Sequence, residues 1–243
     1  MTDMLLTIVT VTKNCATTID RTLDSIVAVK RPGVEYVIVD GVSSDATLSA
    51  IRARGALVDL LVSEPDNGLY NAMNKGVRLA RGRYVLFING DDVLVAEGFP
   101  SIVEAMIHGV DGIICATTLV GDLVHPAETL VARPLGLPFF NSIPHPSTFV
   151  RRTLLLSSPF REDLRIVSDY DFFLGAYLAG QVFRVLPVVT ALHLRGGASG
   201  DVQRSQAELE IVRHELLGWR YPLVNGVAFI YRQGKRFLYK RSV

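Results

Sequence analysis

Acidic residues stand directly after two short apolar runs of the sequence. Asp40 ends the run 34–39, and Asp91 and Asp92 follow the run 84–88. Because the carboxyl ends of parallel strands open on one edge of a sheet, we expect these carboxylates to lie close together. They repel one another unless a cation offsets their charge. Hard oxygen ligands of this kind suit Mg²⁺ or Mn²⁺, which is typically shared with a phosphate.

Two simpler observations bear on that hypothesis. An Asp–Asp pair by itself is also typical of a turn or a helix cap. The segment 12–15 after the first apolar run holds no glycine-rich phosphate loop, so a metal-bridged diphosphate is favoured over a dinucleotide cofactor.

A second polar pattern begins at the turn 66–68. Asn67, Asn71 and Asn74 are spaced by four and three residues, so they share one face of the helix that follows. Asparagine is an unusual choice for a solvated helix face. We therefore interpret this face as a binding surface, with a solvated face as the alternative.

Two further carboxylates, Asp169 and Asp171, stand at the start of the apolar helix expected over 170–179. The helix dipole favours anions there. A capping role for one carboxylate and a catalytic role for the other are both open.

The elements that must position these groups alternate regularly in the first half of the chain. Apolar, β-branched runs predict strands at 5–12, 34–40, 58–62 and 84–88, and helical spacing predicts helices at 17–29, 45–54 and 69–80. This order predicts an α/β fold with a mostly parallel sheet covered on both faces. The second half is less regular: we expect strands at 113–118 and 147–150, loops with a hairpin over 121–146, one or two strands over 182–193 broken at Pro187, and a helix at 202–217.

Composition excludes several classes of protein. The 243 residues are 49% hydrophobic with a formal net charge of +1, which excludes a disordered chain and argues against a nucleic-acid binder. Cys15 and Cys115 are too few for a disulfide framework, and we expect both to be reduced and buried. There is no run of 18 apolar residues and no signal-peptide pattern at the N-terminus, so we expect a cytoplasmic protein.

The net charge conceals an asymmetry. Residues 213–243 hold seven basic side chains and one acidic one, interleaved with aromatics, whereas residues 1–212 carry a net charge of −5. Such a tail suits an interfacial segment on an anionic membrane. A C-terminal helix packed on the domain with a solvated basic edge is the equal alternative.

Four of these segments together, 10–14, 39–47, 66–76 and 87–92, resemble the family 2 glycosyltransferases of bacterial cell-surface polysaccharide synthesis. Each motif is weak alone, but their order and spacing match over roughly residues 5–200. The resemblance implies a GT-A nucleotide-diphospho-sugar transferase fold. It also implies an inverting, metal-dependent transfer from a nucleotide-diphosphate sugar to a saccharide, expected to be lipid-linked.

The resemblance also implies roles for individual residues. Asp91 is the expected metal ligand, since Asn89 replaces the first acid of the family motif, and His193 is a further candidate ligand. Asp169 aligns with the general base, with Ser168 in place of the family's Glu. His145 and Asp171 are expected to contact the acceptor. The nucleotide-sugar contacts are expected from Thr10, Thr12, Asn14, Asp40 at the base or ribose, Asn67, Asn74, Lys75, Asp92 and the loop residue Arg195.

These expectations define a domain plan. Residues 1–200 form the catalytic domain, divided into a nucleotide-sugar half at 1–115 and an acceptor half at 116–200, and residues 201–243 form a C-terminal helix and tail. The tail, from residue 213, is expected to hold the enzyme on the inner face of the cell membrane, with no nucleic-acid partner. The alternatives are a nucleotidyltransferase and, because of Asn89, a non-catalytic sugar-nucleotide-binding scaffold.

Overall fold

The computed structural model describes residues 4–121, 128–194 and 201–227. In the first half, four strands lie parallel in the order β3-β2-β1-β4. Their bounds are β1 Leu6–Thr12, β2 Val34–Asp40, β3 Leu60–Ser63 and β4 Tyr84–Phe87. The connecting helices are α1 Ile19–Val27, α2 Thr47–Ala53 and α3 Leu69–Leu79.

The second half extends this sheet with antiparallel pairings that begin where β8 joins β4, and with one parallel pairing between β6 and β9. Over the described residues, nine strands form one sheet in the order β3-β2-β1-β4-β8-β6-β9-β5, and β7 pairs with β6. The added elements are β5 Val93–Leu94, α4 Phe99–Ile107, β6 Gly112–Gly121, β7 Glu128–Val131, β8 Thr148–Arg151, α5 Arg152–Ser157, α6 Ser168–Leu178, β9 Val182–Leu194 and α7 Val202–Leu217.

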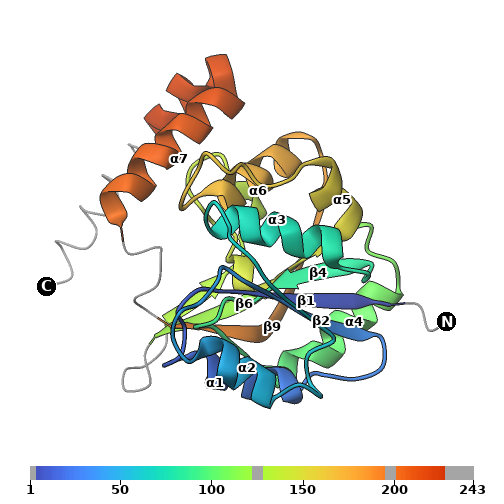
Figure 1. Ribbon diagram of the computed structural model, residues 1–243. Coiled ribbons are helices and arrows are strands. Elements are labelled where there is room, and N and C mark those ends of the chain that lie inside the picture. Colours follow the sequence, from blue (N-terminus) through green and yellow to red (C-terminus); the bar gives the residue numbers. More distant parts are fainter. Residues whose placement is uncertain (1–3, 122–127, 195–200, 228–243) are drawn as a thin grey trace, which may run out of the picture.

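Helices cover both faces of the sheet (Figure 1). Alternate residues of β1 enter different cores: Ile8 packs on the side of α1, α2 and α4, whereas Val9 packs on the side of α3 and α6. β1 and β2 are therefore buried along their whole length, as strands between two helical layers must be.

The expected α/β architecture is confirmed, with three differences in detail. Helices α4 and α5 were not expected from the sequence, although the buried Phe99, Ile102 and Met106 of α4 have helical spacing and Pro100 stands in its first turn, where proline is tolerated. Pro187 does not end a strand, since β9 runs through it. The pairing of β9 with β6 instead shifts register between Val185 and Val189, and this irregularity accommodates a residue that cannot donate a ladder hydrogen bond.

The C-terminal part contains the long helix α7, followed by a short 3₁₀ turn at Gly218–Arg220. In the described ranges, no helix combines the length and apolarity needed to cross a membrane. The predictions for Arg195 and for the tail beyond residue 227 lie outside the described residues.

The two cysteines are free and differ in environment. Cys115 in β6 is fully buried, and burial raises the pKa of its thiol to about 12. Cys15, expected to be buried, is partly exposed in the loop after β1, and its pKa is raised less, mainly by burial.

We predict that iodoacetamide at pH 8 labels Cys15 slowly and leaves Cys115 unlabelled in the native protein, because only an accessible thiolate reacts. Peptide mass spectrometry with and without denaturant measures this. Native labelling of Cys115 at the rate of Cys15 would contradict the buried position of β6.

Candidate active site

A cavity of about 1540 Å³ lies at the carboxyl-terminal edge of the parallel strands. Its walls come from the loops after β1 and β4, the start of α3, the segment 140–146, the region of Asp169, and the end of β9. Ligand pockets for one small molecule are typically about 300–1,000 Å³, so this cavity has room for two substrates together.

The loops after β1 and β2 are joined to each other by hydrogen bonds. The Asn14 backbone N–H donates to Ser43 Oγ (2.9 Å), and the Ser44 N–H donates to Asn14 Oδ1 (2.9 Å). The Cys15 N–H donates to Thr47 Oγ1 (2.7 Å). Asn14 has a φ of 54°, a left-handed conformation that asparagine tolerates. These bonds make one fixed platform beneath the cavity.

Asp40 organises this platform rather than lining the cavity. It is fully buried, and its carboxylate accepts from Thr12 Oγ1, the Ser43 N–H and hydroxyl, and Ser63 Oγ at 2.5–3.1 Å. Burial by itself would raise the pKa of Asp40, but these hydrogen bonds outweigh it and hold the pKa below its ordinary value. Four donors occupy about all of its acceptor positions.

Thr10, also expected to contact the nucleotide, is buried beneath the cavity, where it accepts from the Tyr36 hydroxyl at 3.0 Å. Thr10 and Asp40, both expected at the donor site, therefore do not line the cavity.

Two of the three asparagines on α3 bind residues 160–162 and so have a structural role. Asn74 is buried, donates to the Phe160 carbonyl (2.8 Å) and to Glu162 (3.1 Å), and accepts from the Phe160 N–H (3.0 Å). Asn71 donates to Glu162 at 2.8 Å. Of the three asparagines, only Asn67 lines the cavity.

Lys75 is also directed away from the cavity. Its Nζ lies 2.7 Å from Glu64 Oε1 and 2.7 Å from the Pro65 carbonyl oxygen. The cavity instead receives three other basic side chains, Lys13, Arg133 and Arg165.

Gly68 allows one of these, Arg165, to approach the start of α3. Gly68 has a φ of 121°, and a Cβ there would lie 2.6 Å from Arg165 Nη1. Any other residue would be strained and would collide with the guanidinium. Arg165 Nη1 donates to the Asn67 carbonyl at 2.6 Å, so the turn before α3 is bound to the segment before α6.

Asp91 and Asp92 take different positions at the end of β4. Asp91 lines the cavity, whereas Asp92 is fully buried behind it with Oδ1 2.6 Å from His193 Nδ1. Burial and the charge of Asp92 raise the pKa of Asp91, and the hydrogen bond to Asp92 raises the pKa of His193. Asp92 thus orients His193 toward the cavity rather than contacting a ligand itself.

Asp169 lies in the opposite wall, in the first turn of α6. Its Oδ1 accepts from the Tyr70 hydroxyl (3.1 Å) and from the Tyr170 backbone N–H (2.8 Å). Tyr70 is buried, and both burial and the charge of Asp169 raise its pKa well above the ordinary value. The tyrosine therefore stays protonated, and its single hydroxyl proton is shared between this carboxylate and the Ile166 carbonyl oxygen 2.7 Å away.

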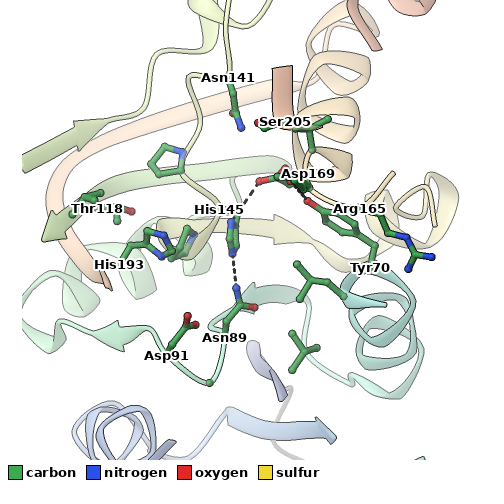
Figure 2. Close-up of a pocket in the computed structure, with 18 of the residues that line it drawn as sticks. Tyr70, Asn89, Asp91, Thr118, Asn141, His145, Arg165, Asp169, His193 and Ser205 are labelled. Atoms are coloured by element: carbon green, nitrogen blue, oxygen red, sulfur yellow. Dashed lines mark hydrogen bonds and ion pairs between the residues drawn. The ribbon is translucent and has the colours of Figure 1, made fainter. Parts of the chain in front are cut away.

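His145 stands between the two walls (Figure 2). Its Nδ1 is 3.5 Å from Asp169 Oδ2, and its Nε2 is 3.5 Å from Asn89 Nδ2. Asn89 Oδ1 is buried without a hydrogen-bond partner in the described part of the chain. In the tautomer with its proton on Nδ1, His145 can accept from the Asn89 amide at Nε2 and turn an N–H toward Asp169.

The remaining predicted residues lie elsewhere. Asp171 is outside the cavity and pairs with Arg161 at 3.5 Å, with its pKa raised mainly by burial. Ser168, in the position of the family's Glu, is fully buried.

The fold brings seven of the predicted site residues together around the cavity: Thr12, Asn14, Asn67, Asp91, His145, Asp169 and His193.

Several residues of the site were missed by the sequence-based reasoning, among them the cavity-lining Lys13 and Arg133. Tyr70 was part of a quoted motif, but its hydroxyl meets Asp169 only through the tertiary fold, 99 residues apart. Arg165 and Ser205 line the cavity from segments without a recognisable motif. Figure 2 shows Ser205 near Asn141, above Asp169.

We predict that Asn74→Ala lowers the free energy of unfolding by about 2 kcal/mol without changing nucleotide affinity, because it leaves buried Phe160 groups unpaired. Urea unfolding and calorimetric titration with UDP and GDP measure the two effects. Asn71→Ala, which removes two exposed bonds, one to Glu162 and one from the Asn67 N–H, is the control with a smaller loss of stability. If Asn74→Ala is as stable as wild type but binds nucleotide more weakly, Asn74 contacts the donor and the structural role is wrong.

Comparisons of the sequence and of the fold with known proteins identify the family of this chain. A sequence model of the family "Glycosyl transferase family 2" matches residues 7–150. The chain is 30% identical over 230 residues to a PGL/p-HBAD biosynthesis glycosyltransferase of Mycobacterium tuberculosis, covering 90% of this chain and 89% of that protein.

Two solved structures share the fold. TarS of S. aureus in complex with UDP-GlcNAc superposes with a TM-score of 0.70 at 18% identity, covering 90% of this chain and 73% of that one. The mannosyltransferase PcManGT of Pyrobaculum calidifontis, in complex with GDP-Man and Mn²⁺, gives 0.63 at 20% identity, covering 93% and 73%. The fold is thus of the GT-A type, and with the family match over more than half of its length, the chain belongs to the family 2 glycosyltransferases.

Proposed function

We propose that this glycosyltransferase is an inverting, divalent-cation-dependent enzyme that transfers a sugar from a nucleotide-diphosphate donor to a saccharide hydroxyl. One observation carries the proposal: Asp91 and Asp169 line the same cavity from opposite walls (Figure 2). One carboxylate is suited to the diphosphate side and the other to the acceptor side.

Donor binding is assigned to the platform side of the cavity. Thr12, Asn14 and Asn67 offer hydrogen-bonding groups there, and Lys13 and Arg165 offer positive charge for the diphosphate. These two cations replace Lys75 in our assignment. The related structures hold UDP-GlcNAc and GDP-Man, respectively, which supports a nucleotide-diphosphate sugar as the donor class.

The residues at the end of β4 fit a divalent cation. Asp91 lines the cavity beside Asp92, and burial together with the charge of Asp92 raises its pKa, so a bound cation would stabilise its ionised form. His193 is held at Nδ1 by Asp92, an arrangement typical of metal-ligating histidines, so its Nε2 is the free ligand atom. In the described segments no group of three or more such side chains forms a complete metal site, so diphosphate oxygens would complete the coordination. When bound, the cation supplies charge stabilisation for the departing diphosphate.

Asp169 is assigned as the general base. Its carboxylate takes the proton from the acceptor hydroxyl while the oxygen of that hydroxyl forms a bond to the anomeric carbon of the donor sugar. The bond between that carbon and the diphosphate oxygen breaks on the opposite face, and the nucleoside diphosphate leaves with the electron pair. The sugar configuration is therefore inverted. Tyr70 and the Tyr170 N–H hold Oδ1, which directs the carboxylate into the cavity.

His145 is proposed to assist this step by orienting Asp169. With Nδ1 toward Asp169 and Nε2 toward Asn89, it keeps the base oriented, and it borders the space left for the acceptor. Asp171 is not part of our acceptor assignment, because it lies outside the cavity.

The C-terminal region is proposed to lie on a membrane surface, where a lipid-linked acceptor would be presented. Trp219 and Leu223 after α7 are 78% and 66% exposed. Arg220 stacks over the Trp219 ring at 5.4 Å, which places a basic group beside the exposed aromatic. This combination, with the basic residues further along the sequence, favours an anionic interface.

We predict that Asp169→Asn lowers donor turnover by roughly 10²–10⁴-fold while leaving nucleotide affinity unchanged, because only the proton acceptor is lost. Asp91→Asn should instead weaken the Mn²⁺ dependence as well as turnover. Both are measured by release of nucleoside diphosphate from UDP- and GDP-sugars, with and without Mn²⁺ or Mg²⁺.

Asp111→Asn is the matched control, since this exposed carboxylate pairs with Arg151 far from the cavity. Wild-type protein that binds nucleotide sugars but never turns them over would reject the enzyme assignment and favour the non-catalytic scaffold.

We predict that removing residues 221–243 reduces co-sedimentation with phosphatidylglycerol vesicles and not with neutral phosphatidylcholine vesicles, because the basic tail supplies the attraction. Added salt should reduce binding of the full chain in the same way. Equal binding by the full and shortened chains would defeat the membrane proposal.

A further inference from the structure

The inner face of α7 meets the backbone that precedes the proposed base. Glu208, in the middle of this helix, is 7% exposed. Its Oε1 accepts from the Arg165 backbone N–H (2.9 Å), and its Oε2 accepts from the N–H groups of Ile166 (2.8 Å) and Val167 (3.3 Å). One carboxylate thus satisfies three consecutive backbone donors.

These three N–H groups precede α6 and take no part in its internal hydrogen bonds. α6 begins at Ser168, and no side-chain cap hydrogen bond forms at Val167. The N–H groups just ahead of a helix need partners from outside it. A buried anion is a strong partner there, because it also faces the positive end of the helix dipole.

The carboxylate of Glu208 is stable as an anion in this position. Burial would raise its pKa, but the three backbone donors and Arg204, at 3.1 Å from Oε1, outweigh burial and lower it. The charge and geometry of Glu208 are therefore matched to the segment 165–167.

The same segment is held from its other side by the first half of the chain. The Ile166 carbonyl accepts from the Tyr70 hydroxyl at 2.7 Å, and Tyr70 also lies 3.1 Å from Asp169. The Arg165 guanidinium contacts the Asn67 carbonyl. Asp169 follows only two residues after Val167, so its position depends on how this short segment is anchored.

We propose that Glu208 is a positioning residue that fixes Asp169 through the backbone of residues 165–167, and that α7 is thereby a working part of the active site. Ser205, one turn earlier on the same helix, lines the cavity itself, which places this face of α7 at the acceptor side. The inference rests on the proposed role of Asp169 as the base.

The test compares Glu208→Gln with Glu210→Gln. Glutamine at 208 keeps one acceptor oxygen but turns an amide group toward backbone N–H donors. Glu210 is a half-exposed acid of the same helix that pairs with Arg213 and does not face residues 165–167. Hydrolysis of UDP-GlcNAc and GDP-mannose gives kcat and KM without a known acceptor, because water then takes the acceptor's place.

We expect Glu208→Gln to lower kcat by about tenfold to a hundredfold, since small displacements of a catalytic group cost this much. Donor KM and calorimetric affinity for UDP should stay unchanged, and Glu210→Gln should match wild type in kcat. Circular dichroism and thermal melts confirm that each variant is folded at the assay temperature. A folded Glu208→Gln protein with wild-type kcat overturns the proposal, as does an equal loss of kcat and donor affinity.

If Glu208→Gln does not fold, Glu208→Asp decides by the same comparison, because it keeps the charge and shortens the side chain by one methylene. Failure of the proposed function would give a different result, namely no turnover by wild type. Active wild type with fully active Glu208 variants would reject only the positioning role.

Discussion

The hydroxyl of Tyr70 is the interaction on which the rest of the site depends. It lies 2.7 Å from the Ile166 carbonyl oxygen and 3.1 Å from Asp169 Oδ1, and so joins α3 to the first turn of α6. The two substrates of a group transfer must be held with their reacting atoms about 3–3.5 Å apart. In the proposed mechanism donor and acceptor bind on either side of this link, and a buried tyrosine that remains protonated keeps the two sides at a fixed separation.

The acidic residues around that link are all aspartates, but their surroundings differ. Asp40 is saturated with donors and holds the loops together, with its pKa lowered. Asp91 is partly desolvated next to Asp92, with its pKa raised, and so favours a cation. Asp169 faces the cavity beside His145. In the proposed mechanism these four aspartates have different roles because each has different neighbours: Asp40 holds the loops, Asp91 would bind a cation, Asp92 orients His193 and Asp169 would accept a proton.

The sequence predicted the first half of the fold closely, because buried parallel strands and amphipathic helices leave strong periodic patterns. It also identified Asp91, Asp169, His145 and His193, which the structure brings to one cavity. It failed where local pattern and tertiary contact diverge. The spacing of Asn71 and Asn74 indicated a binding face, but their partners come from residues 160–162, which no local signal identifies. Tyr70 and Glu208 were missed for the same reason, since their partners lie more than 40 residues away in the chain.

The central claim is that Asp91 and Asp169 serve the two ends of one reaction in a single cavity. The most direct measurement is a crystal structure of the full chain soaked with Mn²⁺ and a nucleotide sugar that it binds, with anomalous scattering used to locate the metal. We expect a manganese peak about 2.0–2.2 Å from an Asp91 carboxylate oxygen, the range typical of carboxylate ligands to such metals. We also expect an anomeric carbon whose free face is turned toward Asp169. A diphosphate bound away from Asp91, or an anomeric carbon shielded from Asp169, would contradict this claim.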